Sequence, residues 1–140
     1  MPGWQQVLDG VERRRLHDVD HHRGREHVHT APRIGSGRVH VLATPVMINL
    51  MEAAALDCAE NLIPTGNQSL GIKLDVRHIA ATPVGMKVRA TARLTAVEGR
   101  TLSFTVEARD EKDLIGDGTH QRLVVNVERF DQRVQAKLAK

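Results

Sequence analysis

Glu52 is the only ionisable side chain between Val41 and Leu56, a run that reads VLATPVMINLMEAAAL. If this run forms a helix, apolar residues occupy every side of it, and such a helix is buried all round. A buried carboxylate is costly unless a partner or a proton neutralises it, and such groups are common at active sites. We therefore expect Glu52 to be buried against a functional partner. The simpler alternative is a solvated position at an edge of the helix, because carboxylates are seldom fully buried.

His78 is the first candidate partner. Apolar residues stand at every second position from Leu70 to Val76, and His78 continues that series. This alternation is typical of a half-buried strand, so the histidine should lie on its apolar face. A histidine in that position is more often structural than catalytic. Beside Glu52, its ring would titrate near neutral pH and act as a general base oriented by the carboxylate.

Thr44 is the third candidate for a functional residue, after Glu52 and His78. Thr44-Pro45 is a favourable helix start, because threonine is a preferred N-cap and proline a preferred first residue. The helix should run to about Asn61, before the breaker Pro64-Thr65-Gly66-Asn67. Capping alone explains this threonine. The free N–H groups of a helix N-terminus also suit a developing oxyanion, where a hydroxyl would serve as nucleophile or would position water.

Several residues within the later strands have weaker signals. Gly71, Gly116 and Gly118 lie inside predicted strands, where glycine marks a bulge or a close approach of a helix or ligand. His120 and Arg122 follow on the same strand as the last two glycines. Charged strand residues usually form a solvated face, so these two indicate little by themselves.

The elements that position these residues make an α+β fold, an antiparallel sheet wrapped around one long central helix. Strands are predicted at Arg38–Leu42, Leu70–His78, Met86–Ala96, Leu102–Arg109 and Leu114–Arg129. Turns at Glu98-Gly99 and Asp110–Asp113 join three neighbouring strands into a meander. One sheet covers only part of a helix that is apolar on all sides, so we expect a second copy of the chain, a homodimer or a tetramer, to cover the remainder.

Three parts of the chain differ in composition. Residues 1–29 are rich in arginine and histidine, with sparse apolar residues, and are expected to be poorly ordered or to form one weak strand near their end. Residues 30–130 carry the periodic patterns of one domain, and residues 131–140 resemble a short polar helix. The histidines of the first part match no strong zinc spacing, so we expect neither metal nor cofactor. These histidines are His17, His21, His22, His27 and His29.

Composition narrows the function further. The 140 residues suit one domain, and the formal net charge is +3. Two Phe, one Trp and no Tyr offer little for base stacking, so no nucleic-acid partner is expected. No stretch has the length of a membrane span, the start lacks the apolar core of a signal peptide, and Cys58 is the single cysteine. A cytoplasmic protein without a membrane partner is the simplest expectation.

From about Thr30 to Phe130 the chain resembles the hotdog-fold acyl-CoA thioesterases, in particular the branch related to fluoroacetyl-CoA thioesterase. The segments that carry the resemblance are VLATPVMINLMEAA, SLGIKLDVRHIAATPVGMKVRATARL, VEGRTLSF and IGDGTHQRLVVNVERF. Together they cover roughly 100 residues in register, which is more specific than any short motif. The resemblance implies a homodimer that hydrolyses a small acyl-CoA thioester near the subunit interface.

The resemblance also implies roles for five residues. Thr44, Glu52 and His78 match the catalytic threonine, glutamate and histidine. Gly71 matches a glycine that lines the substrate, and Arg122 an arginine that approaches the acyl group.

Two features depart from the family pattern. The fluoroacetyl-specific enzyme has an aromatic gate before the helix, whereas the stretch GSGRVHV contains no aromatic residue. The first 27 or so residues also lack the family's usual apolar opening strand.

Two other functions fit the predicted fold. A hotdog hydratase or dehydratase would act on acyl-CoA without releasing thiol, although its Asp-containing signature is missing. A non-catalytic protein would bind acyl-CoA or a small apolar ligand without turnover.

Overall fold

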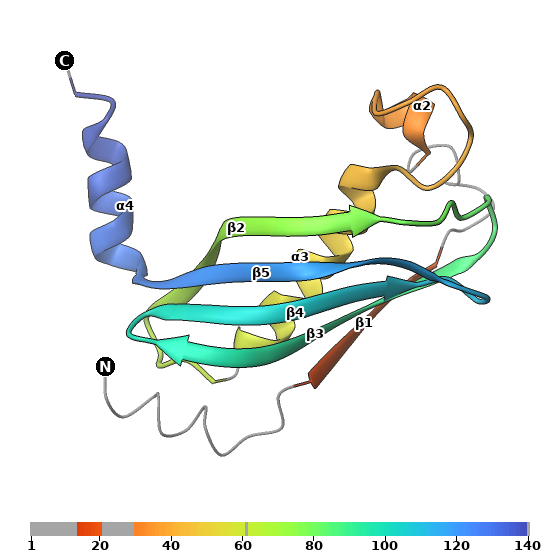
Figure 1. The fold of residues 1–140 in the computed structure, drawn as a ribbon. Coiled ribbons are helices and arrows are strands. Elements are labelled where there is room, and N and C mark those ends of the chain that lie inside the picture. Colours follow the sequence, from red (N-terminus) through yellow and green to blue (C-terminus); the bar gives the residue numbers. More distant parts are fainter. Residues whose placement is uncertain (1–13, 21–29, 61, 140) are drawn as a thin grey trace.

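The structure, a computed structural model, describes residues 14–20, 30–60 and 62–139. A five-stranded antiparallel sheet lies over one long helix, with strand order β1-β3-β4-β5-β2 (Figure 1). The strands are β1 (Arg14–Asp20), β2 (Asn67–His78), β3 (Lys87–Glu98), β4 (Thr101–Arg109) and β5 (Leu114–Asn126), and the helices are α2 (Ala31–Ile34), α3 (Thr44–Glu60) and α4 (Val127–Ala136). The predicted α+β fold, an antiparallel sheet around a central helix, is confirmed.

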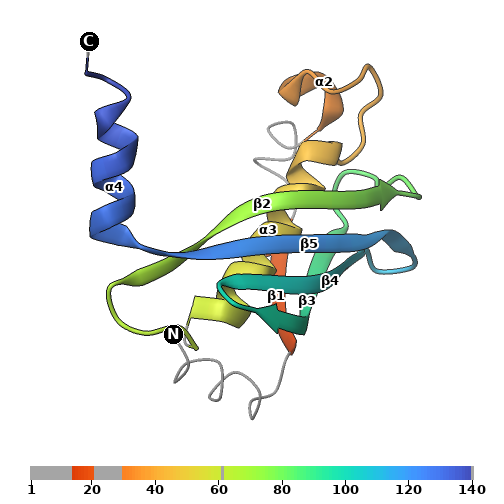
Figure 2. The ribbon, with the colours of Figure 1, turned by 60° about the vertical axis from the view of Figure 1, so that its left-hand side comes forward.

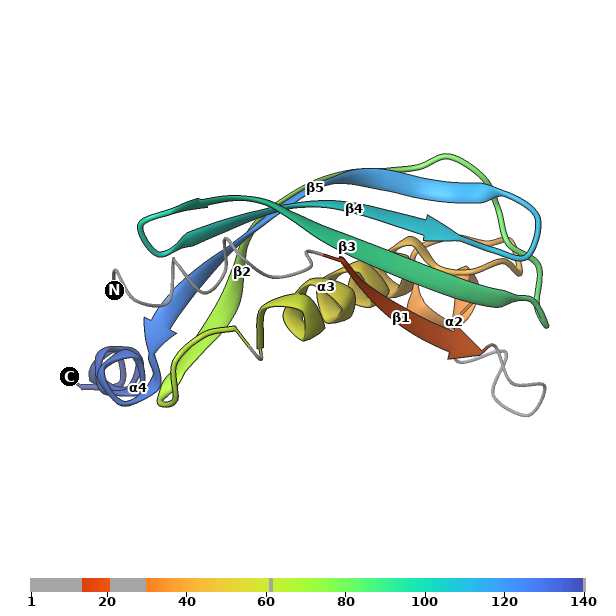
Figure 3. The ribbon, with the colours of Figure 1, turned by 90° about the horizontal axis from the view of Figure 1, so that it is seen from below.

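Helix α3 begins at Thr44, as predicted, and ends at Glu60, one residue before the predicted end. Its buried residues recur three and four apart, so they form one face: Met47, Leu50, Met51, Ala54, Ala55, Cys58 and Ala59. Thr44, Pro45 and Asn49 are exposed, so the prediction that α3 is buried all round is wrong for a single chain. Figure 3 shows the reason, because the sheet covers α3 from one side only.

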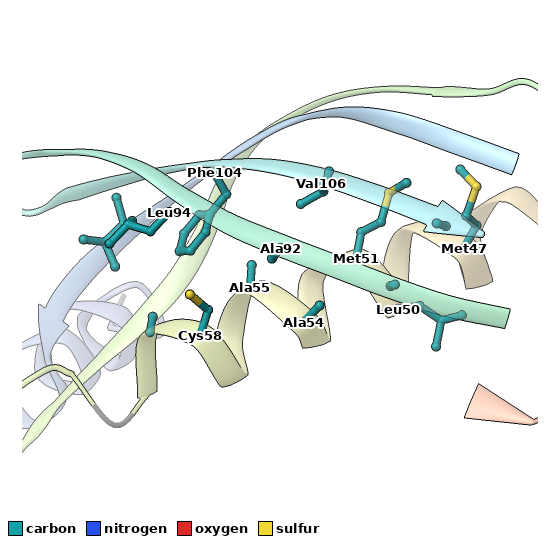
Figure 4. Packing of buried hydrophobic residues seen from close by; sticks show 14 of the residues in the cluster. Met47, Leu50, Met51, Ala54, Ala55, Cys58, Ala92, Leu94, Phe104 and Val106 are labelled. Carbon is teal, nitrogen blue, oxygen red and sulfur yellow. The ribbon is translucent and has the colours of Figure 1, made fainter. Parts of the chain in front are cut away.

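The core forms where α3 meets the inner faces of β3 and β4 (Figure 4). Ala90 and Ala92 of β3 are fully buried, and their small side chains let the helix come close to the sheet. Phe104 and Val106 of β4 fill the space on the same face. Along most of each strand every second residue faces the core, as the period of two predicted. The register of β3 against β4 shifts between Leu94 and Ala96, so Val97 packs against the core where Ala96 was expected.

The two predicted turns of the meander are present. Gly99 lies in the left-handed region, with φ of 59°, between β3 and β4. Between β4 and β5, Asp110 Oδ1 accepts hydrogen bonds from the N–H groups of Lys112 and Asp113 at 2.8 and 2.7 Å. An aspartate side chain that bonds the backbone two and three residues ahead stabilises a tight turn.

Strand β2 departs from simple alternation. Its register against β5 shifts between Gly71 and Lys73, which is a β-bulge. Gly71 faces α3, so its neighbours Leu70 and Ile72 do not, and both are partly exposed. The predicted shared face from Leu70 to His78 is therefore wrong in its first half, because one extra residue resets the alternation.

The structure differs from the expected elements at three other places. No strand spans Arg38–Leu42, where only single bridges link Leu42 to Thr30 and Val41 to Pro83. The last strand ends at Asn126 rather than Arg129, because the Asn126 side chain accepts the Arg129 N–H and caps α4. Strand β1 lies within the segment expected to be poorly ordered or weakly stranded at its end, and pairs with β3.

Helix α4 projects from the sheet in Figures 1 and 2. None of its residues is buried. Among the residues that the structure describes, no helix has the length and apolarity needed to cross a membrane.

Candidate active site

Thr44 and His78 meet where α3 begins and β2 ends. Thr44 Oγ1 lies 2.7 Å from His78 Nδ1, which is a hydrogen bond between residues 34 positions apart. The pair opens onto a cavity of about 360 Å³, and Arg38, Val39 and Ile79 also line it. A larger hollow of about 500 Å³ on the outer, polar face of the sheet contains none of the predicted site residues.

The Thr44 hydroxyl bonds the histidine and is not the helix cap that the sequence suggested. The N–H groups of Val46 and Met47, which a capping threonine would engage, both donate to the Ala43 carbonyl at 3.1 Å. Pro45 has no N–H. The helix itself therefore uses most of the N–H groups that were expected to be free to bind an oxyanion.

His78 is held as a neutral imidazole. Burial lowers its pKa below the usual 6.5, and a backbone hydrogen bond with Ala80 opposes this shift without cancelling it. Its Nε2 atom is buried and has no hydrogen-bond partner. A neutral ring with one unpartnered nitrogen is available to take or give a proton.

Glu52 forms a second cluster with Arg122. Glu52 Oε2 lies 3.5 Å from Arg122 Nη1, and the Arg122 side chain is 7 % exposed. The Glu52 side chain is 39 % exposed, so the expectation of full burial is wrong in the single chain. The guanidinium also donates to Ser69 Oγ at 2.8 Å and to the Ser69 carbonyl at 2.9 Å.

Gly71 provides the space in which this cluster meets. A Cβ atom at this position would lie 2.6 Å from Glu52 Oε2 and 3.2 Å from His120 Cε1. Any side chain here would displace the carboxylate. The bulge of β2 thus places a glycine where Glu52, His120 and Arg122 converge.

The structure therefore divides the predicted site residues into two groups. Thr44 and His78 contact each other, and Glu52, Gly71 and Arg122 contact each other, but no described hydrogen bond or ion pair joins Glu52 to His78. Eight residues of helix separate Thr44 from Glu52, which corresponds to about 12 Å. The proposed Glu–His pair is not formed within one chain.

Sequence reasoning missed two residues of the second group. Ser69 was not singled out, and His120 was given no role although its ring accepts from Arg122 Nη1 at 3.2 Å. The signal for His120 was its position two residues before Arg122, because such residues share one strand face.

The five histidines near the start of the chain, which match no strong zinc spacing, lie where the structure gives no side chains. His21, His22, His27 and His29 fall outside the described residues, and only the backbone of His17 is described. Within the described part of the chain, no three His, Cys, Asp or Glu side chains are grouped so as to hold a metal ion.

The fold and the helix–strand site are those of the hotdog thioesterase superfamily. Residues 26–128 match the fluoroacetyl-CoA-specific thioesterase family, and this chain belongs to that family. It is an acyl-CoA thioester hydrolase by this relationship.

Two comparisons support this assignment, and a third supports the fold alone. The fluoroacetyl-CoA thioesterase of Streptantibioticus cattleyicolor is 45 % identical over 97 residues, which are 69 % of this chain and 70 % of that protein. A solved structure of the fluoroacetyl-CoA thioesterase FlK is 37 % identical with a TM-score of 0.80, covering 91 % of this chain and 96 % of that one. A hot-dog-like protein from Thermanaerovibrio acidaminovorans shares the fold, with a TM-score of 0.83 over 98 % of both chains at 19 % identity.

The described lining of the cavity agrees with the lack of an aromatic residue in GSGRVHV. None of the described residues that line the cavity beside Thr44 and His78 is Phe, Tyr or Trp. The segment from Ser36 to Leu42 contributes glycine, arginine and aliphatic side chains instead.

Proposed function

We propose that this protein hydrolyses a small acyl-CoA thioester with Thr44, His78 and Glu52 as its catalytic residues. The observation that carries the proposal is the 2.7 Å hydrogen bond between Thr44 Oγ1 and His78 Nδ1 at an open cavity. The family's solved relatives include one in complex with fluoroacetate and CoA and one in complex with acetyl-CoA. A small acyl group on CoA is therefore the substrate class we infer.

His78 acts as the general base in this proposal. It removes a proton from the attacking hydroxyl, the oxygen adds to the thioester carbonyl carbon, and the C–S bond then breaks. The proton passes from the imidazole to the departing CoA sulfur, which leaves as free thiol. When water attacks, the other product is the carboxylic acid. When Thr44 attacks, the other product is an acyl ester of Thr44, which a water molecule then hydrolyses to the carboxylic acid and free threonine. The attacking hydroxyl belongs either to water or to Thr44, and only the second route passes through an acyl-enzyme.

Each tautomer of His78 fits a different one of these two routes. If Nδ1 accepts the Thr44 hydroxyl proton, the threonine is the activated nucleophile. If Nδ1 donates to Thr44, Nε2 is the free base and water is the nucleophile. Trapping a covalent acyl group on Thr44 would exclude purely direct hydrolysis.

Glu52 reaches this pair from a second subunit in the proposed mechanism. Strand β2 pairs only with β5 among the described strands, so its other edge is open, and Leu70, Ile72 and Leu74 near it are 37 to 53 % exposed. A two-fold axis normal to the sheet at Leu74 would pair β2 antiparallel with its copy, which is the usual way to cover such an edge. His78 would then lie opposite position 70 of the partner, close to the partner's Glu52.

Gly71 and Arg122 complete the proposed acyl site. The Arg122 guanidinium carries a positive charge beside the space that Gly71 leaves open. A cation there would stabilise a partial negative charge on the acyl carbonyl or its substituent. Glu52 would orient the His78 ring and stabilise its protonated form during turnover.

The test is thiol release from a panel of CoA esters with short, fluoroacetyl, branched and aromatic acyl groups. We expect His78→Ala to lower kcat by about 10²- to 10⁴-fold, and Glu52→Gln to lower it as well. Arg109→Ala, on the outer face of the sheet beside Glu107, is the control and should leave turnover unchanged. Binding of CoA esters without any thiol release by the wild type would overturn the proposal in favour of a carrier.

A further inference from the structure

His120 is the most buried polar group beneath the β2 bulge. It lies on β5 opposite Leu74 of β2 and Phe104 of β4, and it is 1 % exposed. The Phe104 ring stacks beside it, with centroids 6.2 Å apart and an interplanar angle of 29°. A ring with so little freedom has one orientation, so its two nitrogens face fixed partners.

Those partners define the tautomer of His120. Nδ1 lies 2.8 Å from the Lys73 carbonyl oxygen, which only accepts, so Nδ1 carries the proton and donates. Nε2 lies 3.2 Å from Arg122 Nη1, which only donates, so Nε2 is bare and accepts. Lys73 is the residue at which the β2 register resumes after the bulge.

The Arg122 guanidinium is consequently fixed from two sides. Ser69 accepts from Nε and Nη2, and His120 accepts from Nη1. The Nη1 group has a second N–H, and Glu52 Oε2 lies 3.5 Å from this nitrogen. Because a guanidinium is planar with donors in a rigid fork, fixing two of its edges also fixes the direction of the remaining N–H.

We propose that His120 is a positioning residue, whose neutral Nδ1–H ring holds Arg122 in the orientation that directs Nη1 toward Glu52. This inference rests on the proposed function, since it assigns His120 to the same acyl site through Arg122 and Glu52. His120 itself has no contact with the proposed substrate cavity beside Thr44 and His78. His120 contributes by fixing the position of Arg122. Misplacing a group of the site by about 1 Å can lower the rate 10²-fold.

The charges around His120 agree with a neutral ring. Burial lowers the His120 pKa, the positive charge of Arg122 lowers it further, and the Lys73 carbonyl and Glu52 oppose both effects. Of the described elements packed against the ring, β5 contributes Arg122, α3 contributes Glu52, β2 contributes a backbone carbonyl and β4 contributes Phe104. A protonated ring would turn a second N–H toward the Arg122 donor, so the arginine would have to move.

Two matched variants separate positioning from structural support. In His120→Asn the side-chain amide takes the place of Nδ1 and keeps the bond to Lys73 but loses the acceptor for Arg122. In His120→Gln the amide oxygen takes the place of Nε2 and keeps that acceptor. We expect His120→Asn to lower kcat by about 10- to 100-fold with a smaller change in KM, and His120→Gln to retain most of the activity. Gln121→Ala, on the opposite face of β5, is the control for changes on this strand and should match the wild type.

Similar losses in the two variants, at similar melting temperatures, would overturn the proposal, because a merely structural histidine would not distinguish them. Imidazole ¹⁵N NMR of the wild type provides a readout that needs no turnover. We expect the Nδ1–H tautomer of His120 at neutral pH, and an Nε2–H tautomer would overturn the proposal. If the wild type releases no thiol, the proposed function fails, while the NMR result still decides whether His120 accepts from Arg122.

Discussion

The contact between Thr44 and His78 combines two ordinary side chains into one reactive unit. Neither residue is unusual where it stands, because threonine starts many helices and histidine ends many strands. Their hydrogen bond depends on the end of β2 lying over the start of α3, and on the partial burial that keeps His78 neutral. A neutral imidazole is the form that removes a proton, so burial prepares the base.

The lowered pKa of His78 determines how activity varies with pH. Below its pKa the ring is protonated and cannot act as a base, so kcat/KM should fall as the pH falls through that value. Burial lowers the pKa of His78 below 6.5 in the single chain, whereas the carboxylate of Glu52 from the proposed second subunit would raise it, so Glu52→Gln should move the half-maximal point to lower pH. The measurement is a pH profile of thiol release by the wild type and by Glu52→Gln, and a half-maximal point that does not move would contradict a carboxylate beside His78.

Two glycines should respond differently to the same added methyl group. In Gly71→Ala the new Cβ meets the flexible end of Glu52, which can move aside, so the fold should survive while thiol release falls. In Gly116→Ala the new Cβ lies 2.8 Å from the Arg77 carbonyl, a backbone atom that cannot yield without moving β2. We expect Gly116→Ala to lower the free energy of unfolding by about 1–3 kcal/mol.

Thermal melting and thiol release of the two glycine variants, measured together, check this contrast. A strong loss of stability in Gly71→Ala with normal activity in Gly116→Ala would contradict the expected contrast.

At the scale of elements, local patterns predicted α3 and the β3–β4–β5 meander well. Thr44-Pro45 located the start of α3, and alternation over Met86–Arg109 identified both strands with their core faces. Leu70–His78 was predicted as a strand, but its bulge was not, because a bulge depends on how β5 pairs with it. The segment Arg38–Leu42 has the composition of a strand, yet it forms only isolated β-bridges.

The candidate site was predictable in its residues but only partly in its contacts. Glu52 and His78 were recognised because each is a polar residue in an apolar pattern. Thr44 was recognised because Thr-Pro is a favourable helix start. Their pairing was not predictable, since which side chains meet depends on the crossing of α3 and the sheet. Arg122 was given a role only through the family resemblance, because its burial depends on Ser69, 53 residues away in sequence.

The segment from Ser36 to Leu42 is the element that should set fluorine selectivity. Without an aromatic side chain at the cavity, little distinguishes a fluorine from a hydrogen on the acyl group. We expect kcat/KM for fluoroacetyl-CoA and acetyl-CoA to differ by less than about 10-fold, since small differences in apolar contact give weak discrimination. Parallel assays of both esters check this, and a preference of 10³-fold or more would show another source of selectivity.

At the scale of the whole molecule, two surfaces of the single chain have nothing packed against them. One side of α3 is open, and the outer edge of β2 has exposed apolar residues beside it. A long apolar edge strand is a liability that proteins normally cover. The proposed second copy at this edge would cover both surfaces and bring Glu52 of the partner subunit to His78.

A lysine in the β2 edge should therefore abolish both assembly and turnover. We expect the wild type to behave as the proposed dimer and Leu74→Lys as a monomer in sedimentation or light-scattering measurements, with kcat reduced to the level of Glu52→Gln. Thr119→Lys, an exposed position on the adjacent strand β5, is the matched control and should remain dimeric and active. Full activity of a monomeric Leu74→Lys protein would contradict a shared site.

The strand order also determines when the site can come into existence as the chain folds. Strands β3, β4 and β5 are joined by tight turns and can form early, because short loops close at little entropic cost. Strand β2 precedes them in sequence but joins last in space, at the far side of β5. Contacts between residues so distant in sequence form slowly. The Thr44–His78 and Ser69–Arg122 bonds both depend on β2, so a chain that has formed only the β3–β4–β5 hairpins lacks both contacts until β2 docks.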